Sequence, residues 1–131
     1  MNLITRDTDY AMRALCVMAR SREKIISVDE LVRETKIPRP FLRKILQVLN
    51  KKSIAKSYRG KGGGFSLIKN PSNICLADIM RVFQGEFKLS EHMFKKKKCP
   101  RVKKCNLKKK LDEIDGYVQE QLASITVASI K

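Results

Sequence analysis

The chain has 131 residues and a mass of 15.0 kDa, which is enough for one domain to bury a core without disulfide bonds. Its 29 Lys and Arg residues against 13 Asp and Glu residues give a formal net charge of +16, which indicates a polyanionic partner, nucleic acid before membrane. No apolar run approaches the roughly 18 residues of a membrane span, and Asp7 and Asp9 stand where a signal peptide would be apolar. We therefore expect a cytoplasmic protein without membrane contact, whose cysteines are free thiols or metal ligands.

A first helix is predicted over residues 8–20, because apolar residues recur three and four positions apart on one face. The apolar positions are Tyr10, Ala11, Ala14, Leu15, Met18 and Ala19. Asp7, Thr8 or Asp9 is expected to cap its N-terminus. Cys16 lies inside this helix, and we interpret it as a small buried hydrophobic residue.

A second and a third helix are predicted on either side of a short turn. Ser27 followed by Glu30 is typical of a capping box and opens a helix that runs to about Thr35. Residues 36–38 form the turn, and Pro40 suits the first turn of the third helix. The third helix is expected to bury Phe41, Leu42, Ile45, Leu46 and Leu49 and to turn Arg39, Arg43, Lys44 and Gln47 outward. Two short helices around a turn, the second one cationic, indicate a helix-turn-helix.

Two short strands follow the third helix. Ile54, Lys56 and Tyr58 alternate along the first strand, and the alternation resumes at Phe65. The glycine-rich loop over residues 60–64 joins the strands as a hairpin. A cationic helix followed by a cationic hairpin is the layout of a winged helix-turn-helix, which places the helix in the major groove and the wing at the neighbouring minor groove or backbone.

The rest of the chain contains two more helices and a loop. A fourth helix runs from about Leu76 to Gly85, with Cys75 packing at its start. Residues 86–98 lack periodicity and are expected to form a mobile loop. From Asn106 a long helix carries a coiled-coil-like apolar stripe at Leu107, Leu111, Ile114, Val118, Leu122 and Ile125. Such a stripe needs a partner, most simply a second copy of the chain. Residues 126–130 are expected to add a last short turn.

These elements define the expected architecture. It is mainly α: a winged helix-turn-helix domain over residues 1–85 with a two-stranded wing, a cysteine-containing basic loop over residues 86–105, and a long C-terminal dimerisation helix with its tail over residues 106–131.

Several motifs together resemble a known family. The opening T-D-Y-A-M-R-A-L, the helix I-P-x-x-F-L-x-K-I-L, the wing R-G-x-G-G-G-F-x-L, the cysteine loop and the long last helix occur in this order. In these features, which cover nearly the whole chain, it resembles the Rrf-two (Rrf2) family of bacterial transcription regulators, whose branches include IscR, NsrR and CymR. The resemblance implies a homodimeric winged-helix protein that binds partly palindromic promoter sites in double-stranded DNA, usually as a repressor.

The resemblance also implies which residues contact DNA. They are Arg39, Pro40, Phe41, Arg43 and Lys44 on the recognition helix, and Arg59, Lys61, Gly62 and Gly63 with the backbone of Gly64 on the wing. The residue types suit this role, because Arg forms paired hydrogen bonds with guanine and Lys acts as a point charge on phosphate. Glycines let the backbone approach the sugar edges. Taken singly, each cationic residue also fits a solvated surface charge.

Many members of this family carry an iron-sulfur cluster, of the 2Fe-2S or 4Fe-4S type, on the loop before the dimerisation helix. Their cysteines have the spacing C-x5-C-x5-C, of which Cys99 and Cys105 preserve the last two. Met93 occupies the first position, where a thioether is a poor ligand for iron, whereas the imidazole of the neighbouring His92 is a good one. Asp9 falls where the NsrR branch places a ligand from the other subunit. The resemblance thus suggests a site of Cys99, Cys105 and His92 with the partner's Asp9.

The alternative is a cluster-free regulator of the CymR type, whose cysteines pack or sense thiol state and whose activity is controlled by a protein partner or by thiol state. Ten cationic residues and no acid lie between Lys95 and Lys110. This run favours an anionic cluster, and it also suits a soluble loop that adds nonspecific DNA affinity. An enzyme is not expected, because the chain has one His, no recognisable nucleophile and base spacing, and no Lys-Ser/Thr after its glycine run.

Overall fold

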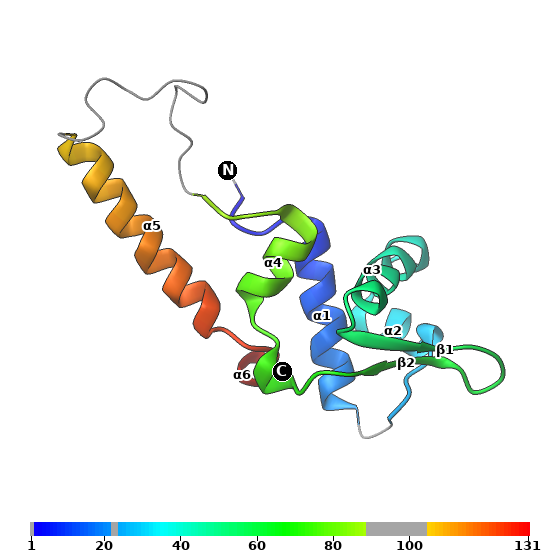
Figure 1. Cartoon of the computed structure of the whole chain (residues 1–131). Helices are drawn as coiled ribbons and strands as arrows, with labels where there is room; N and C mark the ends of the chain where they lie inside the picture. The colour runs from blue at the N-terminus through cyan, green and yellow to red at the C-terminus, as the bar shows by residue number, and fades with distance from the viewer. Residues whose placement is uncertain (1, 22–23, 89–104) are drawn as a thin grey trace.

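The computed structural model describes residues 2–21, 24–88 and 105–131, and in these ranges the chain is mainly helical with one two-stranded sheet (Figure 1). The elements in chain order are α1 (Arg6–Arg20), α2 (Val28–Thr35), α3 (Arg39–Lys51), β1 (Ala55–Tyr58), β2 (Gly64–Leu67), a 3-10 turn (Pro71–Asn73), α4 (Leu76–Gln84), α5 (Asn106–Ser124) and α6 (Val127–Ile130). The predicted fold, mainly α with a two-stranded wing and a long C-terminal helix, is confirmed. Across the described ranges, no helix has the length and apolarity needed to cross a membrane.

Helix α1 lies at the centre of the body. It contacts α2 and α3 on one side and α4 and α6 on the other (Figure 1). Ala11, Ala14 and Leu15 are fully buried, so neighbouring helices approach its axis closely. Cys16 is also buried within this helix, as predicted.

The prediction for the cap of α1 is wrong. The helix begins at Arg6, and Thr5 is its N-cap, with an extended backbone and a side-chain oxygen that accepts a hydrogen bond from the backbone N–H of Thr8 at 3.4 Å. Asp7, Thr8 and Asp9 lie inside the first turn instead. The Thr8 hydroxyl is engaged elsewhere, because it donates to Oε1 of Gln84 at 2.7 Å. A contact between residues so far apart in the sequence leaves no local pattern.

The helix-turn-helix forms as predicted. The Ser27 hydroxyl accepts a hydrogen bond from the backbone N–H of Glu30 at 3.1 Å and starts α2. Lys36 takes a left-handed conformation with φ of 60° and ends it, and Pro38 precedes α3. The buried face of α3 consists of Leu42, Ile45, Leu46 and Leu49. Phe41 does not belong to this face, contrary to prediction, since it is 38% exposed.

The wing is tied to the start of the helix-turn-helix. Strands β1 and β2 pair antiparallel, with Ala55 opposite Leu67 and Tyr58 opposite Gly64. Ile26 adds a bridge to β2, because its N–H donates to the carbonyl of Phe65 and its carbonyl accepts from the N–H of Phe65, both at 2.9 Å. The wing therefore moves with the segment that begins α2.

Helix α5 is only partly outside the core. Its C-terminal end packs on α4, where Leu122 is 4% exposed, while its N-terminal half projects from the body (Figure 1). Leu107 and Ile114 in the projecting half are 67% and 52% exposed. The C-terminal part of the apolar stripe thus belongs to the core of the chain, and only its N-terminal part is exposed. The helical last turn, α6, is confirmed and buries Val127 completely.

The predicted loop over residues 86–98 lies mostly outside the described residues, together with Cys99 and His92. Helix α4 ends next to Gly85, as predicted.

Candidate nucleic-acid interface

The N-terminal end of α3 presents a cationic surface. The side chains predicted for the recognition helix are all exposed: Arg39, Pro40, Phe41, Arg43 and Lys44. Burial of the opposite, leucine-rich face fixes the rotation of α3 about its axis and so fixes which residues face outward. In helix-turn-helix proteins, this end of the second helix is the one that meets base edges. The five residues are therefore exposed together at the N-terminal end of α3.

A groove separates α3 from the wing. Arg39 and Arg43 line it from α3, and Tyr58 and Gly63 line it from the wing. At its edge, Asp29 of α2 forms an ion pair with Arg39. Asp29 is 79% exposed, so this pair contributes at most about 1 kcal/mol. A phosphate can therefore replace the carboxylate at little cost.

The tip of the wing is open. Gly60 and Gly62 have φ of 86° and 78°, with no atom within 4 Å of where a Cβ would stand. The Gly63 N–H donates to the Gly60 carbonyl at 3.0 Å and closes the turn. Arg59 and Lys61 are exposed on either side of Gly60. Two cations thus stand on a turn at which no other described residue packs on Gly60 or Gly62.

The last two glycines have a different role. A Cβ on Gly63 would collide with the carbonyl oxygen of Tyr58, and a Cβ on Gly64 would collide with the carbonyl oxygen of Ile26. The packing of the wing itself therefore requires glycine at these two positions. At Gly60 and Gly62, by contrast, glycine is favoured only by the positive φ.

Sequence reasoning missed Tyr58 as part of this surface. The Ser66 hydroxyl donates a hydrogen bond to the phenol oxygen of Tyr58 at 3.5 Å, and this bond lowers the pKa of Tyr58. The ammonium of Lys56 lies 5.3 Å from the centre of the Tyr58 ring. The period-two alternation of β1 assigned Tyr58 to a strand but gave no indication of what its side chain faces.

Sequence reasoning also missed Arg6. Its guanidinium carbon lies 4.6 Å from the centre of the Phe41 ring and 6.0 Å from that of Tyr10. The two rings are 6.5 Å apart and tilted by 54°. Arg6 stands two residues before the T-D-Y motif, and nothing in the sequence connects it with α3 across the intervening helices.

Of the suggested metal ligands, Cys105 and Asp9 lie among the described residues. Cys105 is the N-cap residue of α5 and is half-buried, and the Asp9 carboxylate pairs with Arg13 of the same helix at 2.8 Å. Cys99 and His92 lie outside the described residues. Within the described part of the chain, no three His, Cys, Asp or Glu side chains form a group that could hold a metal ion.

The donor chemistry is only partly suitable for iron. A thiolate and a carboxylate are both iron ligands, but Asp9 would have to leave Arg13 to serve as one. The other two cysteines are unsuited, because burial raises the pKa of the Cys16 thiol and of the Cys75 thiol. Both thiols therefore stay protonated near neutral pH and behave as packing groups.

Comparisons with known proteins identify the family. The family model Rrf2, described as an iron-dependent transcriptional regulator, matches residues 4–131. A candidate HTH-type transcriptional regulator of Aquifex aeolicus (strain VF5) is 32% identical over 123 residues, which are 92% of this chain and 85% of that protein.

Solved structures agree in fold. CymR (YrzC), the global cysteine regulator of B. subtilis, superposes with a TM-score of 0.81 at 24% identity, over 99% of this chain and 96% of that one. IscR of T. potens has a TM-score of 0.73 at 25% identity, over 97% and 84%. The family match, together with the exposed basic helix and its wing, shows that the chain belongs to the Rrf2 family of DNA-binding transcriptional regulators and is not an enzyme.

Proposed function

We propose that the protein is a homodimeric repressor that binds a partly palindromic promoter site. The observation that carries this proposal is the single surface shared by the exposed end of α3 and the open wing. Arg39, Arg43 and Lys44 supply side chains for base edges and phosphates, and Arg59 and Lys61 supply cations to the adjacent minor groove or backbone.

The dimer is supported by the projecting half of α5. Leu107, Ile114 and Tyr117 are 67%, 52% and 64% exposed, although all three are large and apolar or aromatic. An apolar helix face of this kind is covered in a stable protein. A second α5 from another copy offers the same stripe in return, as an interface with twofold symmetry requires. Two recognition helices would then meet successive turns of the duplex.

The signal is proposed to act at the cysteine loop. Loss or gain of an iron-sulfur cluster on Cys99 and Cys105 would change the segment that leads into α5, and so the separation of the two recognition helices. The description of the family as iron-dependent supports this reading. The alternative is a cluster-free regulator controlled by thiol state or by a protein partner. Met93 in place of a cysteine and the pairing of Asp9 with Arg13 favour that alternative.

Anaerobic purification distinguishes the two. A clustered protein contains iron and is brown, and Cys99→Ala with Cys105→Ala abolishes both. A colourless, metal-free protein that still binds its DNA supports the cluster-free regulator.

The DNA-binding role is tested by selecting bound duplexes from a random library. We expect enrichment of a partly palindromic sequence. The Arg43→Ala variant should lose preference at particular positions, at a cost of about 1–3 kcal/mol where Arg43 reads guanine. The Lys61→Ala variant should weaken binding to all sequences about equally. If both variants weaken all sequences equally, α3 is not the reading element, and if no sequence is enriched, the proposed function is wrong.

A further inference from the structure

Arg6 forms a cluster with two aromatic rings at the exposed end of α3. Its guanidinium lies over the Phe41 ring at 4.6 Å and beside the Tyr10 ring at 6.0 Å. Phe41 is a large apolar side chain that the described part of the chain leaves 38% exposed. The ring face holds the guanidinium in place without using any of its N–H groups. Arg6 is therefore held in place and keeps N–H groups that can donate hydrogen bonds to another acceptor.

This cluster lies on the side of α3 that faces away from the wing. At about 100° per residue, Lys44 lies about 100° and Phe41 about 160° around the helix axis from Arg43. Arg43 lines the groove beside the wing. Lys44 and Lys51 instead line a second groove, whose other wall includes Asp7 of α1. The first turn of α1 therefore flanks α3 on the side that the wing does not cover.

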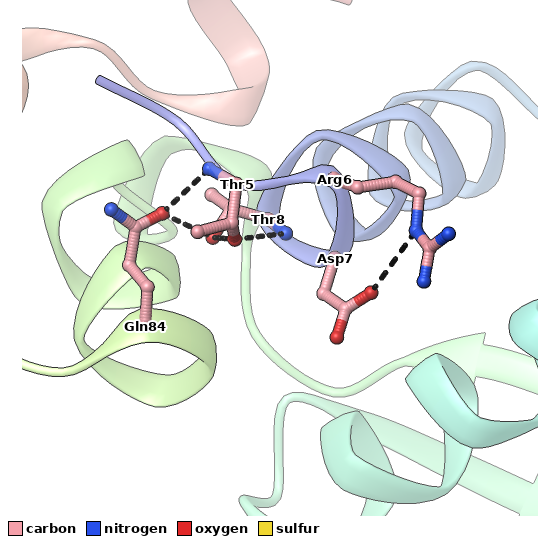
Figure 2. A network of polar contacts seen from close by, with 5 residues as sticks. All are labelled: Thr5, Arg6, Asp7, Thr8 and Gln84. Atoms are coloured by element: carbon pink, nitrogen blue, oxygen red, sulfur yellow. Dashed lines mark hydrogen bonds and ion pairs between the residues drawn. The ribbon is translucent and has the colours of Figure 1, made fainter. Parts of the chain in front are cut away.

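Three hydrogen bonds hold this first turn to α4. The side-chain oxygen of Gln84 accepts from the Thr5 N–H at 3.1 Å and from the Thr8 hydroxyl at 2.7 Å, and its amide donates to the Leu3 carbonyl at 3.1 Å. Figure 2 shows Gln84 on one side of the turn and Arg6 on the other. The Thr8 side chain is completely buried. The backbone that carries Arg6 is therefore fixed relative to the body.

The nearest acid leaves most of the guanidinium available. Asp7 lies 3.8 Å from Nε of Arg6 in an exposed pair (Figure 2). A contact of this length and exposure is weak. It engages Nε, so the terminal amino groups can donate to a second acceptor. Lys44 shares the groove with Asp7 and offsets its charge.

We infer that Arg6 is a DNA-backbone contact, which binds a phosphate on the edge of the major groove opposite to the wing. A helix in the major groove lies between two phosphate backbones, and the wing reaches only one of them. Arg6 stands beside the front of α3 on the other side, where the second backbone passes. The inference rests on the proposed function and adds to it a contact from a helix outside the helix-turn-helix.

The test is the salt dependence of binding to a fluorescent mixed-sequence duplex of roughly 30 base pairs, long enough for two half-sites and their flanks. A phosphate contact acts on any sequence, so the promoter need not be known. Each neutralised phosphate contributes about 0.9 to the slope of log affinity against log salt. A dimer carries two copies of Arg6, so the Arg6→Ala slope should be smaller than the wild-type slope by about 1.8.

Arg81→Ala is the matched control. The Arg81 side chain is 63% exposed and Arg6 is 62% exposed, and each is paired with an Asp. Arg81 lines a cavity between α4 and α5, away from α3. Its removal changes the net charge equally and should leave the slope at the wild-type value. Arg6→Lys keeps the charge and should retain most of the slope. Circular dichroism checks that the variants fold.

The outcomes separate the inference from the proposed function. A smaller slope for Arg6→Ala than for Arg81→Ala supports the phosphate contact. Equal slopes for the two variants overturn it, whether both match the wild type or both fall, because the effect is then absent or only that of net charge. A wild-type slope near zero overturns the proposed function itself.

Discussion

Substitution of Gly64 by Ala should break the bridge that ties the wing to the start of α2. The added Cβ would meet the carbonyl oxygen of Ile26, which is the acceptor for the Phe65 N–H. The Ile26 backbone must then move, and both hydrogen bonds of the bridge between Ile26 and Phe65 are lost. At 0.5–1.5 kcal/mol each, their loss lowers the free energy of unfolding by about 2 kcal/mol. For a chain of this size, the melting temperature should fall by roughly 6–10 °C.

Gly62→Ala is the matched comparison in the same wing. Gly62 has φ of 78°, but no atom lies within 4 Å of its would-be Cβ. Only the left-handed conformation is penalised, at about 1 kcal/mol, so its melting temperature should fall by roughly half as much. Scanning calorimetry measures both variants. If Gly64→Ala is as stable as Gly62→Ala, the bridge to Ile26 does not hold the wing and the reasoning is refuted.

Three further predictions concern other parts of the chain. Gln84→Ala removes three hydrogen bonds to residues 3–8 and should lower the free energy of unfolding by about 1–3 kcal/mol, measured by urea denaturation; the exposed Gln121→Ala should change it by less than about 0.5 kcal/mol. Ile114→Glu places a charge on the exposed apolar stripe and should convert the proposed dimer to a monomer in sedimentation. Gly116→Glu should not, because no described atom lies within 4 Å of its added Cβ. Burial raises the pKa of the Cys16 thiol in the folded chain, so as the pH rises above the pKa of a free thiol, the unfolded chain loses the thiol proton first. The free energy of unfolding should therefore fall as the pH rises through that range. Cys16→Ala should remove this part of the pH dependence.

Each of these has an outcome that contradicts it. Equal denaturation midpoints for the variants of Gln84 and Gln121 would mean that α1 and α4 are joined by packing alone. A dimer that survives Ile114→Glu would place the interface elsewhere. An unchanged pH profile in Cys16→Ala would mean that other groups control the alkaline loss of stability.

Local patterns in the sequence predicted the elements that carry the proposed function. The spacing of Leu42, Ile45 and Leu49 predicted α3 and its outward face, because burial of one face determines what the other presents. The glycine run predicted a hairpin, because few other residues close so tight a turn. These features depend on neighbours within one or two helical turns.

Contacts between distant segments could not be predicted in this way. The Thr8 hydroxyl donates a hydrogen bond to Gln84, far along the chain, and Thr5 is the N-cap of α1 instead. Phe41 has the spacing of a core residue, but at the first turn of α3 it meets Arg6 and Tyr10 at the surface. The helical period of 3.6 residues shows on which side of a helix a residue lies, but it does not show what packs against that side.

The stripe on α5 shows the same limit. Its spacing is continuous from Leu107 to Ile125, and spacing alone treats all of it as one interface. In the fold, Leu122 completes the core of the chain and Ile114 does not. Only the three-dimensional arrangement divides the stripe into a buried part and an exposed part.

The most direct test is the mass of the complex formed on a duplex selected from the random library, measured by analytical ultracentrifugation. The account predicts two chains on each partly palindromic duplex, and a much weaker complex when one half-site is scrambled. A single chain per duplex, with the same affinity for the scrambled site, would contradict it.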